Sequence, residues 1–194
     1  MTRNLKEQIL KTASELFYSQ GIKATGVDAI VKAAGTTKMT LYKYYPSKED
    51  LVIAYLRRRD VDFTQWFVAQ IDDRAAHPRD KLVAIFDVIG EWMQKPEFRG
   101  CAFINASAEF PLEDNPVHRV SAEFYDKFRG YIAELARSAD AAHPDALAQQ
   151  LALLFAGAIV SEQMKQNSDA IVTARAAAEI LIDLALRGHP ELSR

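Results

Sequence analysis

Residues 25–48 read TGVDAIVKAAGTTKMTLYKYYPSK, and this stretch decides the fold. It predicts two short helices, over about 26–34 and 37–45, separated by a tight turn at Gly35. Pro46 ends the second helix, because proline disfavours helical geometry in the residue before it. Two short helices around a tight turn form a helix-turn-helix, so the spacing predicts that arrangement here.

The pattern of helices extends in both directions from this stretch. Apolar residues at helical spacing predict a preceding helix over 4–20, stopped by Gly21, and a following helix that starts at Ser47 and continues through the junction. Start signals of the S/T/N-x-x-D/E type pair Asn4 with Glu7, Thr25 with Asp28 and Ser47 with Asp50. Further helices are expected over 60–75, 79–94, 102–110, 117–140, 145–166 and 169–187. No run of alternating β-branched residues is bounded by turn signals, so the predicted class is all-α.

The second helix of the motif carries the candidate contacts to DNA. Its polar N-terminal end is the part that enters the major groove in this arrangement, while flanking hydroxyl and ammonium groups meet phosphates. The candidates are Thr25, Thr36, Thr37, Lys38, Met39, Thr40, Tyr42, Lys43, Tyr44 and Lys48. Other readings stay open: Thr25 and Ser47 as helix caps, Leu41 and Tyr45 as core, and the lysines as solvated surface charges.

The charge distribution favours the same interpretation. Residues 1–60 hold 11 Lys/Arg and 6 Asp/Glu, a net of +5, whereas residues 61–194 hold 13 and 20, a net of −7. A basic module on an acidic body is typical of a nucleic-acid-binding segment, although surface variation alone can produce such a split. One cysteine and four scattered histidines exclude a disulfide framework and a zinc finger, so we expect neither metal nor cofactor. The polar start and the lack of a long apolar run predict a cytoplasmic protein without a membrane segment.

Residues 9–56 resemble the N-terminal domain of the TetR family of bacterial transcription regulators. The matching pieces are A-x-x-L-F-x-x-x-G (13–21), T-x-V-x-x-I (25–30), A-A-G (33–35), T-L-Y-x-Y-Y (40–45) and P-S-K-E-D-L (46–51). Met39 stands where the family often has a small residue, which should alter base preference rather than abolish binding. The resemblance implies an all-helical homodimer, usually a repressor released from a palindromic operator by a small molecule. We therefore expect a DNA-binding domain at 1–48 and a ligand-binding and dimerisation domain at 49–194.

The body offers candidates for a small-molecule site. Most of its aromatic residues are ordinary core, but a mainly apolar cavity with a few polar groups is what such a site needs. The candidates are Phe63, Trp66, Phe67, Phe86, Trp92, Cys101, Asn105 and Glu109. The last three follow a GC-x-x-x-N-x-x-x-E pattern that resembles a stretch in one subgroup of TetR-like regulators. Asn105 and Glu109 could orient a ligand or satisfy backbone groups between helices, and Cys101 could be a low-pKa sensor or a small buried residue.

The last two helices are apolar and predict a four-helix interface between two copies, or else simply the closure of the monomer core. Dimerisation is favoured because one recognition helix contacts too few base pairs for useful specificity. The competing class is an all-helical ligand carrier or enzyme with an incidental helix-turn-helix. No nucleophile–base set or metal cluster is evident, so we predict a regulator and not an enzyme.

Overall fold

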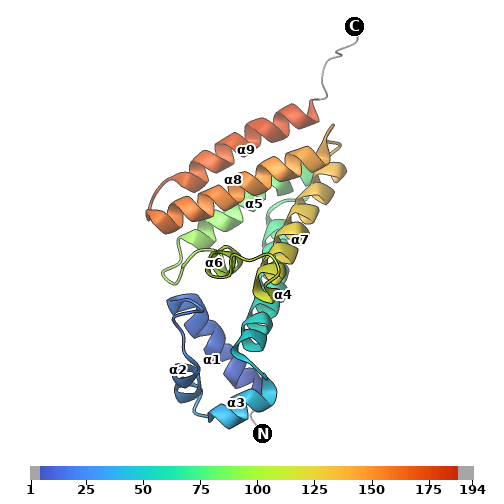
Figure 1. The fold of residues 1–194 in the computed structure, drawn as a ribbon. Coiled ribbons are helices and arrows are strands. Elements are labelled where there is room, and N and C mark those ends of the chain that lie inside the picture. Colours follow the sequence, from blue (N-terminus) through green and yellow to red (C-terminus); the bar gives the residue numbers. More distant parts are fainter. Residues whose placement is uncertain (1–4, 188–194) are drawn as a thin grey trace. The chain divides into compact units, whose positions relative to one another are not determined.

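A computed structural model describes residues 5–187, and within that range it contains nine helices and no strand (Figure 1). This confirms the all-α prediction. In chain order the helices are α1 (Leu5–Gln20), α2 (Val27–Ala33), α3 (Lys38–Tyr44), α4 (Lys48–Arg74), α5 (Pro78–Met93), α6 (Ala102–Glu109), α7 (Pro116–Ser138), α8 (Pro144–Met164) and α9 (Ala170–Leu186).

The sequence signals explain most helix boundaries. Gly21 ends α1 with φ +91°, a conformation that favours glycine. Before α4, the Ser47 hydroxyl accepts a hydrogen bond from the Asp50 amide at 3.0 Å and donates to its carboxylate at 2.7 Å, as the start signal predicts. With no helix breaker over 48–74, α4 continues as one helix of 27 residues, which confirms the expected run through the junction. Asn4, the predicted cap of α1, lies outside the described residues.

Thr25 does not cap α2 as its spacing to Asp28 predicted. The N-cap is Gly26, in an extended conformation and with no side-chain cap hydrogen bond. Thr25 is instead 1% exposed, and its hydroxyl donates to the Gly21 carbonyl at 2.7 Å. It therefore closes the turn between α1 and α2 by bonding backward along the chain.

The helices group into two compact units, described separately. The first contains residues up to Phe63 together with Cys101–Phe124, and the second contains Thr64–Gly100 and the chain from Tyr125 onward. The divisions fall inside α4 and inside α7. This grouping differs from the linear division expected at residue 48, because α6 and the first part of α7 pack with the N-terminal helices.

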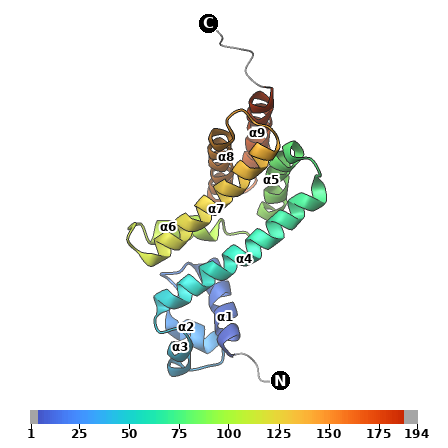
Figure 2. The same cartoon turned by 90° about the vertical axis from the view of Figure 1, so that its right-hand side faces the viewer.

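The N-terminal unit has one continuous apolar core. Residues of α1–α3 and the start of α4 meet residues of α6 and α7 in it, and Ile9, Ile30, Leu41, Leu51 and Leu56 are fully buried. Figure 2 shows α1, α2 and α3 together from a second side. Burying one such aliphatic side chain stabilises the fold by roughly 1.5–3 kcal/mol, so this core fixes the placement of the short helices.

In the second unit, α5, α8 and α9 contact one another (Figures 1 and 2). The apolar faces named for a dimer interface largely close this unit's own core, because Leu151, Phe155 and Ile159 of α8 are buried there. By length and composition, α8 is the one helix within residues 5–187 that could also cross a membrane. A buried core helix has the same apolar composition, and the packing of α8 accounts for it.

Candidate nucleic-acid interface

The turn between α2 and α3 is built by backbone hydrogen bonds around Gly35. The Thr36 amide donates to the Val31 carbonyl at 2.9 Å, and the Gly35 amide donates to the Lys32 carbonyl at 3.3 Å. This pair of bonds is the Schellman motif, which needs a left-handed residue after the helix, and Gly35 supplies it with φ +61°. The sequence break at Gly35 is thus a tight, hydrogen-bonded turn.

Side chains on the inner face of α3 fix its position. Leu41 is fully buried and Tyr45 is 5% exposed, with the Tyr45 hydroxyl donating to the Lys6 carbonyl of α1 at 3.3 Å. The alternative reading of these two residues as core is therefore confirmed. At the other end, Thr37 caps α3 by accepting the Thr40 amide hydrogen bond at 3.2 Å. From α1, Gln8 donates to the Ala34 carbonyl at 2.8 Å and ties α2 to the same frame.

The outer face of α3 leaves large side chains in solvent. Met39 is 82% exposed, Tyr42 43% and Tyr44 36%, and Lys43 is exposed beside them. Exposed aromatic and thioether groups are costly on a self-contained surface but suit contacts with thymine methyl groups and sugar–phosphate surface.

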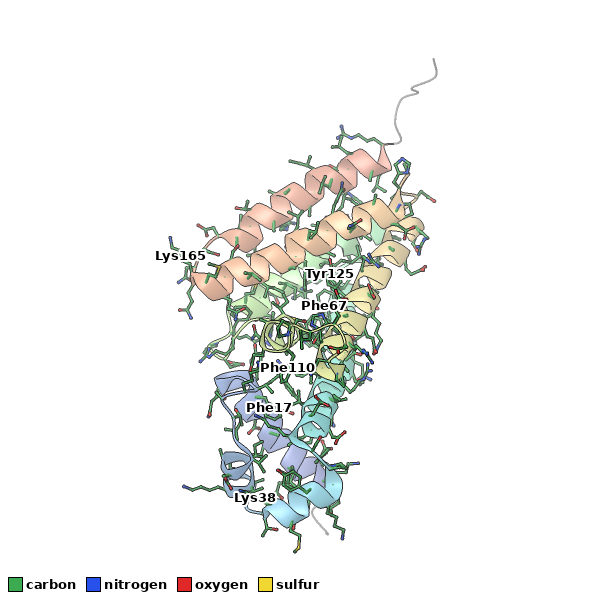
Figure 3. All side chains as sticks on the ribbon, viewed as in Figure 1. Phe17, Lys38, Phe67, Phe110, Tyr125 and Lys165 are labelled. Carbon is green, nitrogen blue, oxygen red and sulfur yellow. The ribbon has the colours of Figure 1, made fainter. Side chains whose placement is uncertain are left out.

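The basic candidates differ in their surroundings. Lys38 forms a 2.7 Å ion pair with Asp28 of α2, whose hydrogen bond and charge raise the Lys38 pKa (Lys38 is labelled in Figure 3). Because an exposed ion pair of this kind contributes little to stability, a phosphate could replace Asp28 as the partner of the Lys38 ammonium. At the start of α4, burial lowers the pKa of Lys48, which is half-buried.

The threonines among the candidate DNA contacts also differ in exposure. Thr36 and Thr40 are partly exposed and Thr37 is exposed, although the Thr37 and Thr40 hydroxyls hydrogen-bond each other at 3.0 Å. By contrast, Thr25 is buried and already bonded to the Gly21 carbonyl, so its hydroxyl does not reach the surface with the others.

A buried frame that presents an exposed, aromatic and basic second helix defines a DNA-binding protein of the helix-turn-helix class. Residues 9–55 match the family model for bacterial regulatory proteins of the tetR family, and residues 78–178 match the tetracyclin repressor-like C-terminal domain. The chain belongs to the TetR family of transcriptional regulators. Regulators of this family bind DNA and act as dimers.

Individual relatives agree with this assignment. The chain is 22% identical over 180 residues to the HTH-type transcriptional regulator YjdC of Escherichia coli, covering 93% of this chain and 94% of that one. It is 36% identical over 84 residues to the HTH-type transcriptional repressor KstR2 of Mycolicibacterium smegmatis, covering 42% and 39%. A crystal structure of a TetR-family regulator from Streptomyces coelicolor superposes with a TM-score of 0.84 at 28% identity, covering 94% and 96%.

The residues predicted to bind a ligand fall in both units. Phe67 packs with Phe128 and Phe155 in the second unit, at ring-centroid distances of 5.8 and 6.2 Å. Phe86 is fully buried in the same unit, and Lys95 lies over the ring of Trp66 at 5.4 Å. Trp92 is in the same unit, and its ring meets the ring of Phe98 edge-on with 4.8 Å between the centroids. Phe63, Cys101, Asn105 and Glu109 belong to the N-terminal unit, where Phe63 meets Phe124 at 5.8 Å.

Glu109 has a structural role that joins distant parts of the sequence. Its carboxylate accepts the amide hydrogen bonds of Ile22 at 2.9 Å and Lys23 at 2.5 Å, in the turn that leads from α1 to α2. This supports the reading of Glu109 as a partner for backbone groups between helices. The sequence contains no local signal for a contact across 87 positions, so these two amides were missed.

Cys101 lies at the N-cap of α6, where a lowered pKa was one prediction. Burial instead raises the pKa of the thiol, and the amides of Ile104 and Phe103 offset only part of this effect. Arg99, two residues before it, donates to the carbonyls of Pro96 and Phe98 at 3.0 and 2.7 Å. Cys101 is partly buried against the core of the N-terminal unit, and its raised pKa argues against a reactive thiol.

Proposed function

We propose that this chain is a homodimeric repressor that binds a palindromic operator through α3 and leaves it when a small-molecule effector binds the body. The observation that carries the DNA-binding part is the two-sided character of α3. Leu41 anchors the helix in the core while Met39, Tyr42 and Lys43 stay outside. A rigid helix with a polar and aromatic outer face is what the major groove accepts.

The proposed contacts are those candidates that the fold leaves accessible. Thr36, Thr37 and Thr40 stand at the start of α3, and Tyr42, Lys43 and Tyr44 follow on the exposed side. Lys38 and Lys48 would contact phosphate oxygens, which position the protein without reading sequence. We leave the buried hydroxyl of Thr25 out of this set.

An apolar face on α8 and α9 supports the dimer. Exposed apolar residues of α8 include Leu153 (61%) and Met164 (83%), and those of α9 include Ile180 (62%) and Leu184 (64%). These side chains point away from the core residues of the same helices, and exposed apolar clusters of this kind mark association surfaces. Because two copies present the same face, a two-fold interface would bury it on both.

A repressor role is supported by family membership and by the partial match to KstR2, which is named a repressor. Effector binding would favour a dimer in which the two recognition helices no longer fit successive half-sites. The protein would act by binding alone, without catalysis, and would do so in the cytoplasm, where the chromosome lies.

The test is an anisotropy titration of the full-length protein with labelled DNA from its own promoter region. We expect tight, sequence-specific binding whose affinity falls steeply with salt, as phosphate contacts release counterions. Tyr42→Ala should weaken operator binding about tenfold or more, within the ~1–3 kcal/mol carried by one good base contact. The matched control Tyr125→Ala, an exposed tyrosine outside the motif, should leave it unchanged. A failure of the wild-type protein to distinguish promoter DNA from random DNA would refute the proposal.

A further inference from the structure

A cavity of about 300 Å³ opens inside the N-terminal unit, between α1, α4 and α6. Phe17, which is labelled in Figure 3, lines it from α1, Tyr55 from α4, and Asn105, Ala108 and Glu109 from α6. Every residue that lines it belongs to this one compact unit. The cavity shares Asn105 and Glu109 with the predicted ligand set, but its other walls were not predicted.

The walls are mostly aromatic and aliphatic. Phe17 and Tyr55 contact each other at 5.6 Å between ring centroids with a 54° tilt, and they are 3% and 2% exposed. Tyr18 adds a third ring. This volume lies at the lower end of the ~300–1,000 Å³ range of ligand pockets, so it suits a molecule with one ring.

Of the residues with polar side chains that line the cavity (Tyr18, Tyr55, Asn105 and Glu109), Tyr55 and Glu109 give it a chemical preference. Tyr55 is nearly fully buried and lines the cavity, so its hydroxyl is the donor that we assign to a ligand there. Burial raises the pKa of Tyr55 well above its usual value, so the group stays a neutral phenol that can donate. The Glu109 carboxylate faces the same space and keeps lone pairs beyond the two that accept backbone amides.

The group that complements a donor and an acceptor together is a hydroxyl, which can accept from Tyr55 and donate to Glu109. A ligand carboxylate would be repelled by Glu109. An ammonium could not accept a hydrogen bond from Tyr55, and Arg59, which lies 4.5 Å from the ring centroid of Tyr18, adds positive charge nearby. Charge and hydrogen bonding thus favour a neutral ligand.

We propose that this cavity is a binding site for a neutral, single-ring phenol, with its hydroxyl held between Tyr55 and Glu109. Its ring packs against Phe17 and the other aromatic walls. The location matters because the same Glu109 carboxylate holds the amides of Ile22 and Lys23. A ligand that hydrogen-bonds Glu109 therefore acts directly on the turn that leads into α2.

The binding test uses calorimetric titration of the full-length protein with 4-ethylphenol as the probe. We expect a dissociation constant on the order of 0.1–1 mM, which is typical of so small a ligand. The capped ether 4-ethylanisole and the charged analogues phenethylamine and benzoate should bind at least fivefold more weakly. Absence of saturable binding, or equal binding of the ether, would overturn the proposal.

Variants locate the site. Tyr55→Phe keeps the ring and removes the donor, so affinity should fall by about two- to tenfold, the range of one net hydrogen bond. Tyr131→Phe removes a hydroxyl from the second unit and serves as the matched control, with no expected change. Ala108→Leu fills the cavity from an exposed position and should abolish binding. Wild-type affinity in Tyr55→Phe or Ala108→Leu would place the ligand elsewhere and refute the assignment.

The effect on DNA rests on the proposed function and is measured separately. At saturating 4-ethylphenol, the operator affinity of the wild-type protein should fall at least fivefold, and that of Ala108→Leu should not change. Binding without an effect on DNA would refute the coupling through Glu109 and leave the site intact. Loss of operator binding in the ligand-free protein would count against the proposed function alone.

Discussion

The substitution Thr25→Val separates a structural role from a DNA contact at a residue for which both were predicted. Valine keeps the shape and removes the hydroxyl that donates to the Gly21 carbonyl at 2.7 Å. With Thr25 1% exposed, the loss is one net hydrogen bond plus part of the penalty for a buried carbonyl, together about 1–2 kcal/mol. In a chain of 194 residues, 1 kcal/mol shifts the melting temperature by about 2–4 °C, so we expect a decrease of about 2–8 °C.

Thermal unfolding followed by circular dichroism gives the shift, and anisotropy at 20 °C gives operator affinity. Thr25→Val should lower the melting temperature and leave affinity within about twofold of wild type. Its matched control, Thr40→Val, removes a hydroxyl on α3 that is partly exposed, so it should do the reverse, with stability nearly unchanged and affinity reduced. A Thr25→Val protein that melts like wild type but binds DNA poorly would refute the assignment of Thr25 to the core.

Two further outcomes follow from the second unit and from α6. Ile180→Asp places a charge on the exposed apolar face of α9 and should convert the dimer to a 21.7 kDa monomer in analytical ultracentrifugation. The control Val61→Asp, which changes an exposed valine on α4, should leave the dimer intact. A dimer that persists in Ile180→Asp would place the interface elsewhere. Burial raises the pKa of Cys101, so its alkylation by iodoacetamide at pH 8 should be at least tenfold slower than that of free cysteine. The rate should increase only when the protein unfolds. Rapid labelling of the native protein would contradict this expectation.

Much of the fold could be predicted because its determinants are local. Gly21 and Gly35 supply the left-handed residues that end α1 and α2, and Ser47 caps α4 through Asp50. The alternation of buried and exposed positions on α3 also follows from helical spacing, which is why Leu41 and Tyr42 could be assigned to opposite sides.

The remainder depends on contacts that sequence spacing does not encode. Thr25 carries the same start signal as Ser47, yet it turns back toward Gly21 because the chain there folds over the end of α1. Glu109 finds its partners in the α1–α2 turn only after α6 packs into the N-terminal unit. The cavity has the same origin, because its walls come from three helices far apart along the chain.

The discontinuous composition of the N-terminal unit sets a rule for building hybrid regulators. A graft that transfers only residues 1–48 to a foreign body would separate the recognition helix from part of its own core. The transplanted helices would lose the Glu109 carboxylate and an apolar layer consisting of Ala102, Phe103, Ala106, Val117, Val120 and Phe124. The contacts in this protein group residues up to 63 with 101–124, so we expect a graft of both segments to keep the recognition helix in its own core, and a graft of residues 1–48 alone to lose stability.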